Sequence, residues 1–135
     1  MTPPFHGKAL IVVGGPHMSI YPRESLSWDC FDMAVVGDGG FMMTGNEMIA
    51  AVQRRLPILF ILANNGSYAS IRIHQDRAYP TRHLGTDLFN PDFAAMAKGF
   101  GMPVEKIDRE DQIEAALKRG LEANGPYFIE VQTSL

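Results

Sequence analysis

The sequence predicts a single α/β domain, in which a parallel sheet carries helices on both faces in three layers. Short apolar segments typical of buried strands alternate along the chain with segments of helical periodicity. The most apolar segment, residues 58–63, is a continuous run that suits a parallel strand covered on both faces. The chain has 135 residues and is 46% hydrophobic, which is enough for one core and too little for two.

Two strands are expected in the first part of the chain. Residues 8–13 are a short apolar segment that Gly14-Gly15-Pro16 ends, and residues 16–30 show no clear periodicity. Residues 33–36 form the second apolar segment, which runs directly into Gly37-Asp38-Gly39-Gly40. Both segments therefore end at glycines, as strands that lead into turns or binding loops do.

A helix is expected after the second strand, beginning near Asn46. Thr44 and Glu47 have the Thr-x-x-Glu spacing of a capping box, and apolar residues then recur at helical spacing. Pro57 ends this helix. The third strand follows at residues 58–63.

The second half of the chain begins with a segment that lacks clear periodicity. Residues 66–90 are expected to be a long loop with at most one helical turn, and loops of this length are often functional. A helix begins at residues 90–92, with the proline in the first helical position. A strand at 103–107, an amphipathic helix at 109–121 and a last strand at 127–131 complete the alternation.

Composition excludes several classes of partner. The net charge is -3, so a nucleic-acid-binding surface is not expected. The apolar run near the start, Ala9 to Val13, is too short to span a membrane. The single cysteine, Cys30, has no partner for an internal disulfide, which favours a reducing, cytoplasmic setting.

Polar residues follow two neighbouring strands of the predicted sheet. Asp38 follows the second strand and Asn65 follows the third, 27 residues later, with one helix between them. Such a βαβ unit brings both side chains to the same edge, and open parallel sheets bind ligands outside the carboxyl ends of their strands. A carboxylate and an amide oxygen suit Mg²⁺ or Ca²⁺ and not zinc or copper.

Phosphate is expected to bind this cation together with the protein. One carboxylate cannot neutralise a dication, and Mg²⁺ in such sites usually completes its coordination with water and phosphate oxygens. Gly39 and Gly40 leave room for backbone N–H groups to approach phosphates, and the positive end of the following helix points the same way. The residues therefore predict a clamp for a metal and a diphosphate.

The same residues carry a resemblance to a known family. The run from Gly37 to Asn65 resembles the thiamine diphosphate motif, a Gly-Asp-Gly followed at this spacing by Asn-Asn. The surrounding residues are similar to those of the acetolactate synthase-like group, which includes decarboxylases and carboligases of 2-oxo acids. The likeness continues through residues 65–75 and 85–93, and in all it covers residues 33–135. It implies the thiamine diphosphate-binding fold, with Mg²⁺ and thiamine diphosphate as cofactors.

The resemblance also implies roles for individual residues. Asp38 would bind Mg²⁺ through its carboxylate, Asn65 through its side-chain oxygen and Ser67 through its backbone carbonyl. Gly39 and Gly40 would donate backbone N–H groups to the diphosphate. The expected cofactor-binding residues are Gly37, Asp38, Gly39, Gly40, Asn65, Ser67 and Tyr68. No catalytic side chain is expected in this chain.

Two parts of the family pattern have no match in this sequence. The family has a glycine-rich segment ending in a Leu-Pro-x-Ala helix before its Gly-Asp-Gly strand, and residues 14–32 do not match it. Its activating glutamate lies on a pyrimidine-binding domain, usually of another subunit. We therefore divide the chain into an unmatched segment, 1–32, and a cofactor-binding domain, 33–135. We expect it to need a pyrimidine-binding domain on another chain, or a homo-oligomer, for activity.

Other interpretations stay open at this point. The chain is alternatively a non-catalytic binding or subunit-interaction module, one subunit of a split enzyme, or a truncated remnant. Asp38 alone would fit an ordinary Asp-Gly turn, and Asn64 is expected to tie loop backbone. Arg72 and His74 would either contact substrate or be solvated surface residues. A phosphatase of the haloacid dehalogenase type is disfavoured, because the sequence contains no Asp-x-Asp.

Overall fold

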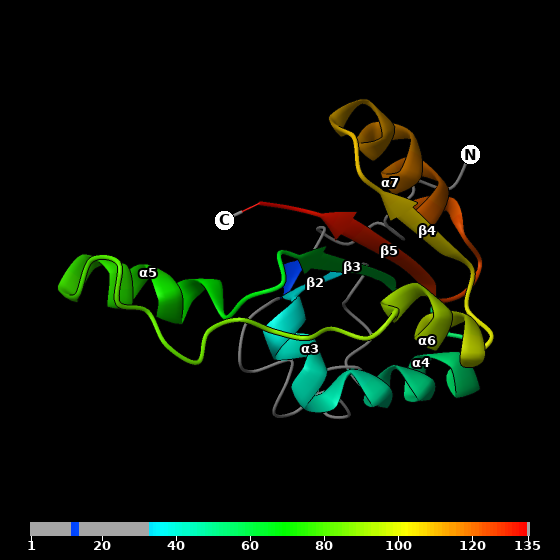
Figure 1. The fold of residues 1–135 in the computed structure, drawn as a ribbon. Helices are drawn as coiled ribbons and strands as arrows, with labels where there is room; N and C mark the ends of the chain where they lie inside the picture. Colours follow the sequence, from blue (N-terminus) through cyan, green and yellow to red (C-terminus); the bar gives the residue numbers. More distant parts are fainter. Residues whose placement is uncertain (1–11, 14–32, 135) are drawn as a thin grey trace.

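Five parallel strands form one sheet in the computed structural model, which describes residues 12–13 and 33–134 (Figure 1). The strand order is β1-β2-β3-β5-β4. The strands are β1 Val12–Val13, β2 Met33–Gly37, β3 Leu59–Asn64, β4 Val104–Ile107 and β5 Tyr127–Gln132. Of the predicted strand at 8–13, only the last two residues are described; the segment at 14–32 lies outside the described residues.

The pairing of the central strands aligns their carboxyl ends. Gly37 of β2 pairs with Ala63 of β3, and Asn64 at the end of β3 pairs with Gln132 of β5. Both pairings are parallel, so the residues that follow β2 and β3 emerge at one edge of the sheet. Asp38 and Asn65 are these residues, as the sequence predicts.

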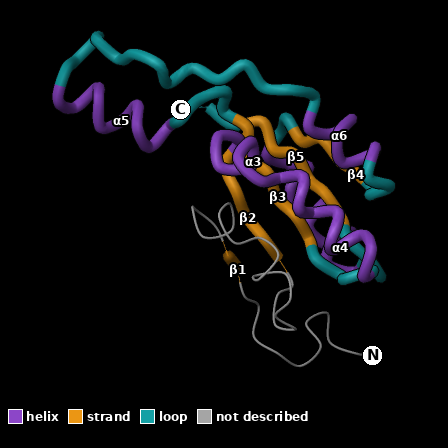
Figure 2. Tube along the Cα trace, turned by 90° about the horizontal axis from the view of Figure 1, so that it is seen from below, coloured by secondary structure: helices purple, strands orange, loops and turns teal. Residues whose placement is uncertain are grey.

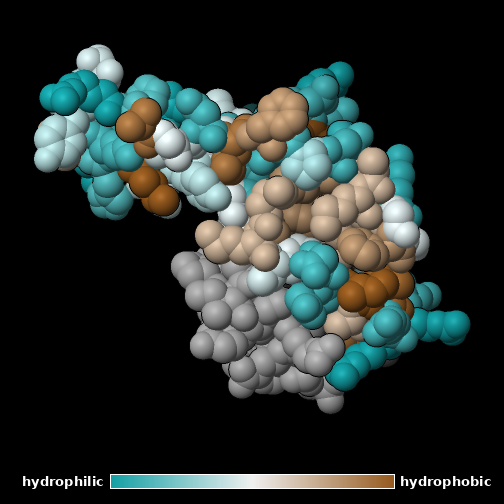
Figure 3. All heavy atoms as spheres, turned by 60° about the horizontal axis from the view of Figure 1, so that its bottom comes forward, coloured by the Kyte–Doolittle hydropathy of each residue, from teal (hydrophilic) through white to brown (hydrophobic). Residues whose placement is uncertain are grey.

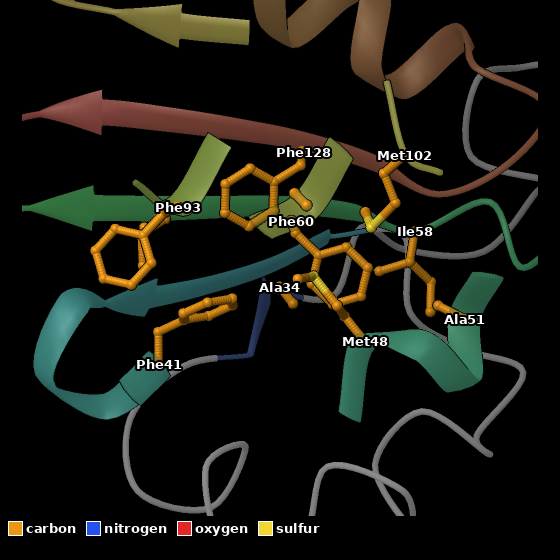
Figure 4. Close-up of a cluster of buried hydrophobic side chains, with 11 residues drawn as sticks. Ala34, Phe41, Met48, Ala51, Ile58, Phe60, Phe93, Met102 and Phe128 are labelled. Carbon is orange, nitrogen blue, oxygen red and sulfur yellow. The ribbon is translucent and has the colours of Figure 1, made fainter. Parts of the chain in front are cut away.

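The larger core lies between one face of the sheet and four helical segments. These are α3 Asp38–Thr44, the 3₁₀ turn η1 Gly45–Met48, α4 Ile49–Arg54 and α6 Phe93–Gly99. Phe41 packs edge-on against Phe93 and Phe128, with ring centroids 5.4 and 5.7 Å apart (Figure 4). Aromatic packing of this kind joins α3, α6 and the sheet into one core.

The opposite face of the sheet is covered by α7, residues Ile113–Glu122, which the 3₁₀ turn η2, Glu110–Gln112, precedes. A second core cluster of Leu59, Ile107, Ala116 and Ile129 lies beneath it. Gly120 lets the helix approach closely, because a Cβ there would lie 2.5 Å from Cδ1 of Leu59. Helices thus cover both faces, and the predicted three-layer α/β fold is confirmed. None of the described helices is long and apolar enough to cross a membrane.

The prediction of a loop at residues 66–90 is wrong for residues 69–78. Helix α5, Ala69–Ala78, occupies these positions and has no buried residue. The helix projects away from the sheet, and the chain returns alongside it before α6 (Figures 1 and 2). Because α5 packs on no core of the described chain, it has no continuous apolar stripe, and periodicity gave no signal for it. We call residues 69–88 the α5 arm.

The helix after β2 begins earlier than the capping box predicted. It starts at Asp38 with Gly37 as the N-cap, and Thr44 is its last residue. Thr44 makes no side-chain capping hydrogen bond at η1, so the predicted capping box with Glu47 is wrong. The sequence did not predict this start, because consecutive glycines disfavour a helix in isolation. In the structure, the buried Phe41 packs the first turns of α3 against the sheet.

The start of α6 also differs from the prediction. Its N-cap is Asp92, whose side chain accepts a hydrogen bond from the Ala95 backbone N–H at 3.0 Å. Pro91 therefore precedes the cap and is not the first helical residue. The Asn90 side-chain amide is engaged with Asp38 and Asn64, and Asp92 provides the cap, so the boundary lies two residues later than expected.

Candidate functional site

Asp38 is the buried carboxylate at the carboxyl end of β2. Its side chain is only 1% exposed. Oδ1 accepts a hydrogen bond from the Gly39 backbone N–H at 3.0 Å. Oδ2 accepts two, from the Gly66 backbone N–H at 2.8 Å and from Asn90 Nδ2 at 2.6 Å. Three neutral donors from three separate segments therefore hold this carboxylate.

Asp38 has no cationic partner among the described residues. The ion pairs of this part of the chain all involve other carboxylates. A buried charge is costly unless it is paired or coordinates a metal. A carboxylate offers about four lone-pair sites, and three hydrogen bonds leave capacity on Oδ1. The environment of Asp38 is compatible with the binding of a cation.

Asn64 closes the end of β3 against the neighbouring strand. Its Nδ2 donates to Oε1 of Glu130 at 2.8 Å, and its Oδ1 accepts from Asn90 Nδ2 at 2.9 Å. The same oxygen accepts from the Gly66 backbone N–H at 3.3 Å. The prediction that Asn64 ties loop backbone is confirmed.

Asn65 and Ser67 lie in the turn that follows β3. Oδ1 of Asn65 accepts from the Ser67 backbone N–H at 3.0 Å, which is an Asx-type turn. Gly66 between them has φ of +66°, a conformation that favours glycine. Ser67 is buried, and its Oγ donates to the Thr86 carbonyl at 2.9 Å. The turn thus fixes the side-chain oxygen of Asn65, and the Gly66 N–H joins the same turn to Asp38.

Tyr68 packs directly against Gly39. A Cβ on Gly39 would lie 2.6 Å from Cδ1 of Tyr68, so only glycine leaves room for the ring. The Gly39 N–H is engaged by Asp38. The backbone of Tyr68 is held in turn by the Thr86 carbonyl, to which its N–H donates at 2.8 Å. The structure therefore brings these two predicted site residues together.

Asn90 is the site residue that the sequence did not reveal. Its Nδ2 contacts both Asp38 and Asn64, although the three residues are far apart in the chain. The only sequence signal there is the Asn-Pro-Asp run, which is also an ordinary helix start. Asn90 Oδ1 is buried and has no hydrogen-bond partner among the described residues.

These residues fit a hydrated Mg²⁺ better than zinc. Among the described residues, no group of three His, Cys, Asp or Glu side chains is positioned to hold a metal. The oxygens of Asp38 and Asn65 instead form a hard donor set that leaves coordination positions for water and phosphate. The buried acceptor Asn90 Oδ1 has no donor among the described residues, and a metal-bound water would supply one.

The side chain of Arg72 makes its hydrogen bonds within the α5 arm. Its Nη1 lies 2.7 Å from Oδ1 of Asp87, and its Nη2 lies 2.9 Å from Nε2 of His83. These contacts tie α5 to the returning chain. His74 is exposed on α5, and His6 and His17 lie outside the described residues.

The structure shows a parallel α/β domain in which polar side chains gather where two neighbouring strands end. Comparison with known proteins extends this description. The model of the thiamine pyrophosphate enzyme C-terminal TPP binding domain matches residues 31–131. The chain belongs to this family of cofactor-binding domains.

Similar proteins include acetolactate synthases and decarboxylases. The large subunit of acetolactate synthase isozyme 2 from Escherichia coli is 36% identical over 100 residues, which is 73% of this chain and 18% of that protein. Benzoylformate decarboxylase from Pseudomonas aeruginosa is 32% identical over 101 residues, covering 75% of this chain and 19% of the relative. The chain thus spans less than a fifth of the length of these relatives.

One solved structure supports the same relationship. The thiamine diphosphate-dependent 4-hydroxybenzoylformate decarboxylase from Rhodococcus jostii superposes with a TM-score of 0.71 at 27% sequence identity. The match covers 76% of this chain and 20% of that one. The fold of the described residues is therefore that of a cofactor-binding domain in a thiamine diphosphate enzyme.

Proposed function

We propose that this chain binds the diphosphate of thiamine diphosphate through Mg²⁺, as one domain of a 2-oxo acid decarboxylase or carboligase related to acetolactate synthase. Asp38, Asn65 and the Ser67 carbonyl are the proposed metal ligands. Gly39 and Gly40 border the diphosphate, with Gly37 and Tyr68 at the edge of the site. The cofactor supplies the carbon–carbon bond chemistry, and these residues bind and orient it.

The observation that carries this proposal is the environment of Asp38. The side chain is buried and hydrogen-bonded, yet no cationic side chain of the described residues pairs with it. A cation bound there would compensate its charge. The acetolactate synthase and decarboxylase relatives support thiamine diphosphate as the molecule that brings the cation's remaining ligands.

Catalysis requires more than the described residues offer. We propose that a pyrimidine-binding domain, on another chain or on a second copy in a homo-oligomer, completes the active site. The range of names among the relatives supports 2-oxo acids as the substrate class. The single cysteine supports a reducing, cytoplasmic setting.

Nuclear magnetic resonance titration of the labelled chain tests the binding proposal. Thiamine diphosphate is added alone, then with Mg²⁺, and EDTA follows. We expect backbone amide shifts at Gly39, Gly40, Asn65 and Ser67 that need Mg²⁺ and reverse with EDTA. Asp38→Asn should abolish them, because it removes the charge that attracts the cation while keeping the shape of the side chain.

Asp108→Asn is the matched control, since it makes the same chemical change at an exposed position. It should leave the titration unchanged. A well-dispersed spectrum of the unaltered chain with no shift at any Mg²⁺ concentration would contradict the proposal. Equal loss of binding in both variants would show that net charge, and not the Asp38 site, attracts the cation.

A further inference from the structure

Four side chains form a continuous line of hydrogen bonds from β5 to the end of β2. Glu130 Oε1 accepts from Asn64 Nδ2 at 2.8 Å. Asn64 Oδ1 accepts from Asn90 Nδ2 at 2.9 Å, and Asn90 Nδ2 also donates to Asp38 Oδ2 at 2.6 Å. The residues come from four segments of the chain, so only the fold brings them together.

The two carboxylates at the ends determine which way both amides point. An ionised carboxylate only accepts hydrogen bonds, so Asn64 must turn its NH₂ group toward Glu130. Its oxygen then faces Asn90, which must in turn present its own NH₂ group. An amide nitrogen carries two hydrogens, and those of Asn90 are divided between Asn64 and Asp38. The reversed amide would place an oxygen 2.6 Å from the Asp38 carboxylate, which is repulsive.

This arrangement makes the two oxygens of Asp38 unequal. Oδ2 receives two donors, Gly66 and Asn90, which use both of its lone-pair sites. Among the described residues, Oδ1 receives the Gly39 N–H alone and retains one site. Without the Asn90 donor, the carboxylate would lose the one side-chain hydrogen bond that the described residues give it, and the two backbone N–H groups of Gly39 and Gly66 would hold it alone.

The segment that carries Asn90 also makes contacts that do not involve Asp38. Asp92, two residues later, caps α6. Lys106 of β4 lies 3.0 Å from Oδ1 of Asp92 and 3.5 Å from Oε2 of Glu130. The segment before α6 is therefore joined to the same strands that hold the other end of the line.

From these contacts we infer that Asn90 is a positioning residue for the proposed cation site. It holds the Asp38 carboxylate so that Oδ1 is presented to Mg²⁺, and Glu130 fixes its direction through Asn64. The inference rests on the proposed function, because it assigns to Asn90 a role toward the same metal. Residues that hold a metal ligand in place typically change metal affinity about 10–100-fold when removed.

The test compares Asn90→Ala with Asp92→Ala in the full chain. Both variants alter the same segment, but only the first removes a contact with Asp38. Mg²⁺ affinity is measured with Mg²⁺ alone and in the presence of thiamine diphosphate. Asn90→Ala should weaken it about 10–100-fold, whereas Asp92→Ala should lower thermal stability and leave the affinity within about twofold.

A second readout needs no metal. The amide resonances of Gly39 and Gly66 report the orientation of the carboxylate, because both N–H groups donate to it. Asn90→Ala should shift both in the metal-free chain, and Asp92→Ala should shift neither. Asn90→Leu retains a branched side chain without donors and provides the same comparison if the alanine variant does not fold.

Unchanged Mg²⁺ affinity and unchanged glycine amides in the Asn90 variants would overturn the inference and leave the proposed function intact. Equal losses of affinity in the Asn90 and Asp92 variants would overturn it as well, since the effect would then be one of segment stability. An unaltered chain that binds Mg²⁺ but does not bind thiamine diphosphate, even with Mg²⁺ present, would contradict the proposed function alone. Absence of any Mg²⁺ binding would overturn both.

Discussion

At the scale of single residues, the candidate site depends on a close contact between a glycine and an aromatic ring. The Tyr68 ring occupies the space that a side chain at Gly39 would need. Gly37, two residues earlier, has no atom within 4 Å of the corresponding Cβ position and has φ of -76°. Glycine is thus required at one position of the motif for packing, and at the other the structure would accept alanine.

Gly39→Ala should therefore destabilise the domain by about 1–3 kcal/mol, because overpacking a well-filled site forces neighbours to move. Gly37→Ala, the matched control, should change the free energy of unfolding by less than about 1 kcal/mol. Urea unfolding of both variants provides the comparison. Removing the ring in the Gly39→Ala, Tyr68→Ala double variant should recover part of the loss; strict additivity would argue against the clash.

Some residues of the candidate site could be predicted from the sequence and others could not. Asp38 and Asn65 each follow a recognisable strand, and a parallel sheet necessarily brings such residues to one edge. Asn90 contacts Asp38 across 52 residues of sequence, and Glu130 contacts Asn64 across 66. Such contacts could not be predicted from a local sequence pattern, because they form only when several separate elements have come together in the fold.

At the scale of secondary-structure elements, two helices of equal length differ in what holds them. Both α5 and α7 have ten residues, yet α5 has no buried residue and α7 buries Ala116 and Gly120. Figures 1 and 2 show α5 projecting from the domain, whereas Figure 1 shows α7 beside β4 and β5. The hydrogen bonds of α5 are consequently stabilised by local contacts, such as those of Gln75 with Leu84.

Hydrogen exchange should separate the two helices. Amides of α5 should exchange orders of magnitude faster than those of α7, because local opening of α5 exposes little apolar surface. Exchange followed by mass spectrometry on the unaltered chain measures this, with β3 as the slow reference. Equal protection of the two helices would mean that α5 is packed against another surface in solution.

An ion pair between Glu105 of β4 and Arg119 of α7 joins these two elements. It should make the free energy of unfolding depend on pH. The Arg119 guanidinium, which donates to Glu105 at 2.8 and 2.6 Å, lowers the pKa of Glu105 from 4.5 to about 2, with help from the Tyr127 hydroxyl. A carboxyl whose pKa is lower in the folded state stabilises the fold above its unfolded pKa. That stabilisation is lost as the pH falls from about 4.5 to about 2.

Glu105→Gln should therefore be less stable than the unaltered chain near neutral pH, by about 1 kcal/mol because Arg119 is largely solvated. The difference should shrink progressively below about pH 4.5. Thermal unfolding across this pH range measures it, with Glu114→Gln on the exposed face of α7 as the control. A difference that is constant with pH would show that the pair contributes through packing and not through charge.

Elements were predictable where they pack on the sheet and poorly predictable elsewhere. The apolar runs of β2, β3 and β5 and the amphipathic pattern of α7 reflect their burial, so these elements could be predicted from the sequence. The start of α3 and the whole of α5 have no such pattern. Asp38 begins a helix through two glycines because the core holds Phe41, and α5 is a helix without a core contact.

At the scale of the whole molecule, the described chain combines a layered body with an unsupported arm. The site lies where they meet, since Ser67 and Tyr68 connect the end of β3 to α5. Large apolar side chains are exposed along this side of the molecule, and Figure 3 shows them over the arm and the adjoining body. They are Met42, Met43, Ile71, Ile73, Tyr79, Leu84 and Phe89.

Exposed apolar side chains in this number favour association, so the chain should form dimers or larger species as its concentration rises. Phe89 is the most exposed of these side chains, and Phe89→Ser should weaken the association without lowering the thermal stability of the monomer. Light scattering over a concentration series measures the effect, and Lys118→Ser, at an exposed position on α7, is the control. A monomer at every concentration would show that these residues need a different partner, and an equal effect of both substitutions would exclude the Phe89 surface as the contact.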